Sequence, residues 1–170
     1  MLKVLGIVSI LSASLAFGAL RRKFSRQRLE TLRELCESLF LLEGELELNR
    51  STLQELMRFG ASRSAGSVHS FYRCLSLTAT KLGEHTFSSL WEEAARYCFP
   101  ELKEDELSTL LALGNTLGRA ELRHQLSSIS ICRNRLQAAL TRAEETYKGE
   151  GRLAYGVPAA LGAIVSILLL

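Results

Sequence analysis

Residues 24–48, FSRQRLETLRELCESLFLLEGELEL, decide the fold of this chain. Apolar side chains recur there every three or four positions, which is the spacing of one face of an α-helix. The apolar positions are Leu29, Leu32, Leu35, Cys36, Leu39, Leu42 and Leu46, and the other face carries Arg26, Glu30, Arg33, Glu34, Glu37 and Glu45. The pattern predicts one long amphipathic helix over about 24–48.

A second long helix is predicted over about 120–148. Its apolar residues alternate steps of three and four from Leu122 to Tyr147. This spacing is typical of helices that pack in coiled-coil fashion against another long helix. We therefore expect residues 24–48 and 120–148 to lie side by side.

The residues between the long helices predict four short ones. Thr52 and Glu55 form a capping-box pattern that starts the first, and Gly83 and Gly118 are placed to end the second and the fourth. The segment 60–67, GASRSAGS, is small and polar, so it is predicted to be a loop. Gly149-Glu150-Gly151 is predicted to be a flexible joint behind the second long helix.

Apolar runs flank this helical region at both ends of the sequence. Residues 1–20 contain a single charge near their start and residues 153–170 contain none, so each run suits a helix that crosses about 30 Å of hydrocarbon. Cations adjoin both runs, at 21–23 and at Lys148 and Arg152, and such residues stay on the cytoplasmic side of a membrane. We therefore predict two transmembrane helices in the cell membrane, with both termini extracytoplasmic.

The predicted fold class is all-α: a cytosolic helical bundle of about six helices, residues 21–152, held between an N-terminal and a C-terminal transmembrane helix. No strong helix breaker separates the first span from residues 24–48, so the two are expected to form one rod. A cleaved signal peptide ending at Gly18 is the competing interpretation of the first run. The single Lys3 before the run and the many cations after it favour a retained anchor.

The sequence lacks the common catalytic motifs. A phosphate-binding loop ending in GK[ST], an HExxH pair and a GxSxG turn are all missing, so we predict a protein that is not an enzyme and has no cofactor or metal. A net charge of +3 is too small to indicate nucleic-acid binding. The four cysteines, Cys36, Cys74, Cys98 and Cys132, form no CxxC pair and are predicted to be reduced, buried thiols.

Two sets of residues are candidates for function or packing. Glu43, Glu45 and Glu47 form an acidic run that could dock a partner protein. Gly114 and Gly118 lie four apart in a Leu-rich helix, where each glycine costs about 1 kcal/mol relative to alanine. We expect another helix to pack closely on Gly114 and a C-terminal turn to form at Gly118.

The chain resembles the stage III sporulation protein AB family. The resemblance spans the chain and is carried by the opening apolar run, residues 39–57, Leu90-Trp91-Glu92, the block Leu113–Gly118 (LGNTLG) with Gln125, and Tyr147-Lys148 before the terminal run. It adds Trp91 and Gln125 to the residues expected to pack helices together. The chain departs from the family pattern at Arg119-Ala120-Glu121 and in the Ser/Gly-rich segment 60–67.

The resemblance implies a function that the residues alone do not. Members of the family belong to the channel assembled between mother cell and forespore in endospore-forming bacteria. Their cytosolic part is similar to the inner-membrane platform protein of type II secretion and type IV pilus machines. By that analogy the chain would be a platform subunit in the mother-cell membrane that docks a cytosolic secretion-type ATPase, besides other channel subunits, the lipid bilayer and possible further copies of itself. The alternative is a membrane-tethered regulator or adaptor of another membrane complex.

Overall fold

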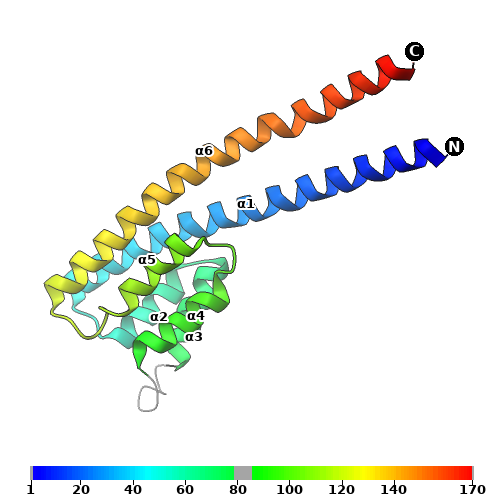
Figure 1. Cartoon of the computed structure of the whole chain (residues 1–170). Coiled ribbons are helices and arrows are strands. Elements are labelled where there is room, and N and C mark those ends of the chain that lie inside the picture. The colour runs from blue at the N-terminus through cyan, green and yellow to red at the C-terminus, as the bar shows by residue number, and fades with distance from the viewer. Residues whose placement is uncertain (1, 79–85, 170) are drawn as a thin grey trace.

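The computed structural model describes the backbone of residues 2–78 and 86–169, and the side chains of residues 20, 22–78 and 86–149. These residues form six helices and no strand, so the predicted all-α class is confirmed. The helices are α1 (Leu2–Asn49), α2 (Leu53–Arg63), α3 (Gly66–Thr78), α4 (Phe87–Cys98), α5 (Glu104–Gly114) and α6 (Leu122–Leu169). In Figure 1, α1 and α6 run antiparallel as a long pair, and the short helices cluster beside the end of the pair that lies far from both termini.

The two long helices pack through the apolar stripes that the sequence predicted. Two ion pairs fix their register: Arg33 Nη2 lies 3.0 Å from Glu144 Oε1, and Arg133 Nη2 lies 3.2 Å from Glu43 Oε2. The two pairs show that the helices are antiparallel, because residue numbers rise along α1 in the direction in which they fall along α6. The buried residues of the pair include Leu32, Leu35, Leu39 and Leu42 of α1 and Ile129, Cys132, Leu136 and Leu140 of α6.

An aromatic cluster joins the short helices into one layer. The Phe71 ring centroid lies 4.8 Å from that of Trp91 and 5.1 Å from those of Tyr72 and Phe99. Such edge-to-face and tilted contacts stabilise a core beyond the area that they bury. The Tyr72 hydroxyl lies 3.1 Å from Ser38 Oγ, so the layer is also tied to α1 by a buried hydrogen bond.

The helix starts follow the chemistry of their first residues. The capping box predicted at Thr52 is present: Thr52 Oγ1 accepts from Glu55 N, and the Glu55 carboxylate accepts from Thr52 N at 2.8 Å. The preceding turn is tight, and Arg50 adopts a left-handed φ of 49°. This geometry reverses the chain between α1 and α2.

The expected loop at 60–67 is wrong. Helix α2 continues to Arg63 and α3 begins at Gly66, so only two residues lie between them. Gly60 is buried in α2, and a Cβ atom there would lie 2.9 Å from Tyr72 Cγ. Helix continues through this small residue because the Tyr72 ring packs on it, a tertiary contact that local composition does not reveal.

Two further boundaries differ from the predictions. Helix α5 ends at Gly114, and residues 115–120 form turns rather than a helix that reaches Gly118. A flexible joint was predicted at 149–151, but α6 continues through these residues, so the two glycines do not end the helix. The predicted helix end at Gly83 lies outside the described residues.

Both apolar ends fall where the structure describes no side chains. This applies to most of the two predicted spans, 1–20 and 153–170, and to the alternative cleavage point at Gly18. In the part of the chain that is described, no helix is long and apolar enough to cross a membrane. The backbone of α1 continues without a break past residue 20, as expected for a single rod.

Candidate partner-binding surface

The predicted acidic run lies at the end of α1 that is remote from the N-terminus. Glu43 forms an ion pair with Arg133, and Glu45 accepts hydrogen bonds from Asn49 Nδ2 at 2.9 Å and Ser51 Oγ at 2.6 Å. Glu47 is exposed and has no such contact among the described residues. Two of the three carboxylates thus stabilise the protein's own fold, and Glu47 is the one fully presented to solvent.

Gly114 lies directly against Trp91. A Cβ atom at Gly114 would lie 2.3 Å from Trp91 Cδ1, well inside van der Waals contact. The Trp91 side chain is fully buried, and its Nε1–H donates to Leu110 O at 2.8 Å. The glycine therefore allows the indole of α4 to reach the backbone of α5.

Gly118 and Gln125 form the turn between α5 and α6. Gly118 has a φ of 77°, which favours glycine, and its N–H donates to Gln125 Oε1 at 3.2 Å. Gln125 Nε2 donates to Ala120 O at 2.6 Å. A Cβ atom at Gly118 would also lie 2.9 Å from Leu53 Cδ2. This turn sets where α6 begins.

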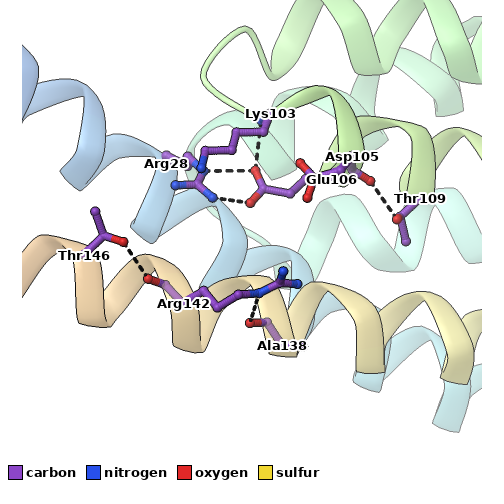
Figure 2. Close-up of polar contacts among 8 residues, drawn as sticks. All are labelled: Arg28, Lys103, Asp105, Glu106, Thr109, Ala138, Arg142 and Thr146. Carbon is purple, nitrogen blue, oxygen red and sulfur yellow. Dashed lines mark hydrogen bonds and ion pairs between the residues drawn. The ribbon is translucent and has the colours of Figure 1, made fainter.

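A nearly buried ion pair that sequence reasoning missed joins α1 to α5. The Arg28 guanidinium donates two hydrogen bonds to Glu106, whose carboxylate also accepts from Lys103 N at 2.9 Å (Figure 2). The Glu106 side chain is 1% exposed and that of Arg28 is 16% exposed. The hydrogen bonds to Glu106 raise the pKa of Arg28. The signal was present in the sequence, because Glu106 shares its helix face with Leu110 and Leu113.

A groove of about 510 Å³ lies beside α1, between the start of α3 and the α4–α5 connection. Its Phe24 is 61% exposed, and Glu101 accepts a hydrogen bond from Thr31. The carboxylates give the groove an acidic lining that suits a basic side chain. The lining residues are Phe24, Gln27, Glu30, Thr31, Glu34, Ala65, Gly66, Ser67, Val68, Pro100 and Glu101.

The cysteines differ in exposure. Cys36 and Cys132 are buried, whereas Cys98 is half-buried and Cys74 is exposed, so the prediction of four buried thiols is wrong for Cys74. Burial raises the pKa of Cys36 to about 11 and that of Cys132 to about 12, which keeps both protonated at neutral pH. Among the described residues no three His, Cys, Asp or Glu side chains are placed to hold a metal ion.

The fold and these surfaces define a helical-bundle protein whose notable features are charged helix faces and shallow grooves between helices. The sequence profile described as Stage III sporulation protein AB matches residues 3–170. The chain therefore belongs to the stage III sporulation protein AB family, as the resemblance predicted.

Two relatives agree with this assignment. Stage III sporulation protein AB of Bacillus subtilis (strain 168) is 25% identical over 172 residues that cover all of both chains. A solved structure of a Stage III sporulation protein AB superposes with a TM-score of 0.63 over 72% of this chain and 97% of that chain, at 24% identity. The solved structure supports the fold.

Proposed function

We propose that this chain is a non-enzymatic, membrane-anchored platform subunit of the channel between mother cell and forespore. Its family is one of sporulation proteins, and the residues flanking the bundle carry the two apolar runs expected of spans. In this proposal both runs cross the mother-cell membrane, and the bundle works in the cytosol.

The observation that carries the proposal is the placement of the two chain ends. Helices α1 and α6 direct both ends toward the same end of the molecule, whereas the short helices lie beside the opposite end (Figure 1). An apolar run at the start of α1 and another at the end of α6 would then enter one bilayer from the same side. The short helices would project into the cytosol, where a soluble partner reaches them.

The partner proposed is the cytosolic secretion-type ATPase of the same system, docked at the acidic end of α1. Glu47 is exposed there, and Glu45 adds negative charge near it, whereas Arg133 offsets the charge of Glu43. Charge of one sign on an exposed surface speeds the association of a partner with the opposite charge. The ATPase would therefore present a basic surface.

The test is co-purification of the ATPase with the full-length chain from sporulating cells. Glu47→Lys reverses an exposed charge without removing any contact that the structure describes, so it should abolish co-purification and reduce spore yield. Glu93→Lys makes the same change on α4, on an exposed residue, and serves as the matched control. Equal co-purification of the ATPase with Glu47→Lys, Glu93→Lys and the unchanged chain would remove this docking site.

The alternative is a membrane-tethered adaptor of another membrane complex. In that case the ATPase would be absent from the material purified with the unchanged chain as well as with both variants, and a different membrane protein would be recovered with the unchanged chain.

A further inference from the structure

The long helices carry exposed faces of opposite charge. We call one the acidic edge, on α1, and the other the basic edge, on α6. The acidic edge consists of Glu30, Glu34, Glu37, Leu41 and Leu48, and the basic edge consists of Ile131, Arg135, Ala138 and Arg142. Glu30 also forms an exposed ion pair with Arg26 of its own helix, at 2.8 Å. In the acidic edge the charged residues lie nearer the termini and the apolar residues farther from them. In the basic edge Ile131 lies farthest from the termini and Ala138 lies between the two arginines.

The two edges do not face each other within one copy. Arg133 and Glu144 mark the side of α6 that faces α1, and at 3.6 residues per turn the basic edge lies roughly half a turn away from it. The same reasoning places the acidic edge roughly a third of a turn from the side of α1 that faces α6. The edges are therefore open to contact from outside.

The arginines of the basic edge have no acidic partner among the described residues. Arg135 forms no ion pair there, and Arg142 Nε donates only to Ala138 O of its own helix at 3.1 Å (Figure 2). Hollows of about 140 Å³ and 200 Å³ lie between α5 and α6 along this edge, and both are lined by Thr109 and Arg135. Asp105 and Glu106 also line the larger hollow, and the Glu106 carboxylate is already paired with Arg28. Ile131 is 51% exposed beside them. This surface would suit an acidic helix that also carries apolar residues.

The acidic edge of a second copy meets that description. The ion pairs between α1 and α6 place Arg142 level with Glu34 and Arg135 level with Leu41. Glu37 lies between these two levels, within reach of either arginine. Farther from the termini, the apolar end of one edge lies at the height of the apolar end of the other. Two upright copies standing side by side thus match without any shift along the helix axes.

We propose that the acidic edge of one copy binds the basic edge of a neighbouring copy in a head-to-tail contact. This inference rests on the proposed function, because anchoring in one membrane holds neighbouring copies upright and at the same height. The contact is heterologous, so a pair of copies retains one unused acidic edge and one unused basic edge, and the assembly grows into a ring or an open row. The groove of Phe24, beside Glu30 and Glu34, then receives the Arg142 guanidinium of the neighbour.

The test measures self-association of the full-length chain in phosphatidylcholine vesicles. Chains are labelled at the exposed Cys74 with donor or acceptor dyes, and energy transfer reports the association. Variant A carries Arg135→Glu and Arg142→Glu, and variant B carries Glu30→Lys and Glu37→Lys. Flotation of the vesicles reports membrane insertion separately.

Each variant alone should associate at least about tenfold more weakly than the unchanged chain, since the substituted residues would then face residues of like charge on the neighbouring copy. An equal mixture of A and B should regain the association, because each altered edge then meets an edge of opposite sign. Arg119→Glu with Arg123→Glu, the same charge change on exposed arginines outside the edge, should leave association unchanged.

Association of A or B as strong as that of the unchanged chain would overturn the proposal, as would a mixture that stays dissociated. Chains that associate but do not float with the vesicles would contradict the membrane anchoring and leave the contact supported. Chains that float but never associate would contradict the contact alone.

Discussion

Replacing Gly114 with alanine tests the packing at the centre of the short-helix layer. The added Cβ would lie 2.3 Å from Trp91 Cδ1 and 2.4 Å from Trp91 Cγ, so the indole or α5 must move. Overpacking of this kind costs about 1–3 kcal/mol, and losing the Trp91–Leu110 hydrogen bond adds about 1 kcal/mol. Alanine regains at most about 1 kcal/mol of helix propensity. The expected net loss of unfolding free energy is about 2 kcal/mol.

The assay is thermal unfolding of the full-length chain in detergent, followed by far-ultraviolet circular dichroism and by tryptophan fluorescence. Trp91 is the one tryptophan of the chain, so its fluorescence reports this layer. A loss of 2 kcal/mol lowers Tm by about 8 °C for a bundle of this size. Gly114→Leu should lower it further.

Gly44→Ala is the matched control. Nothing lies within 4 Å of a Cβ atom built there, near the C-terminal end of α1, so this variant should gain stability from helix propensity. In a Trp91→Leu background the penalty of Gly114→Ala should shrink, because its clash partner is gone. The packing argument is refuted if Gly114→Ala unfolds at the same temperature as Gly44→Ala, or if its penalty persists without the indole.

Two further predictions concern the buried ion pair and the buried thiols. Arg28→Met strands the Glu106 carboxylate in the core and should lower the urea-unfolding free energy by about 3 kcal/mol, whereas Arg26→Met removes only an exposed i, i+4 pair and should change it by about 0.5 kcal/mol or less. The pKa of a cysteine thiol is ordinarily 9.0, and burial raises that of Cys36 to about 11 and that of Cys132 to about 12. The contribution of these two thiols to stability is therefore fully present below pH 9 and is lost as the pH rises from 9 through their pKa values in the folded protein. Unfolding free energies measured from pH 8 to pH 11 should therefore decline, and the part of the decline that is due to the thiols should be missing when both cysteines are alanine.

Periodicity predicted the long helices well because their apolar stripes face only each other and the short-helix layer. The same argument located the capping box at Thr52, where the two residues that cap the helix are close in sequence. Such features depend on neighbours that the local sequence contains. They are the part of a fold that a single sequence reveals most directly.

The errors arose where distant residues decide the outcome. Gly60 was expected in a loop because its neighbours are small and polar, but the Tyr72 ring packs on it inside a helix. No pairing of Arg28 with Glu106 was predicted, because only the fold brings them together over a separation of 78 residues. Glu43 and Glu45 likewise acquire contacts of their own, which leaves Glu47 as the exposed member of that run.

The central claim, a cytosolic bundle anchored at both ends, is tested most directly by labelling Cys74 in intact cells. The variant retains Cys74 as its only cysteine, and the probe is a maleimide that cannot cross membranes. A second variant with its single cysteine added at the C-terminus provides the opposite-side control. The account predicts that Cys74 is labelled only after the cells are lysed, whereas the terminal cysteine is labelled in intact cells. Labelling of Cys74 in intact cells would place the bundle outside the membrane and contradict the account.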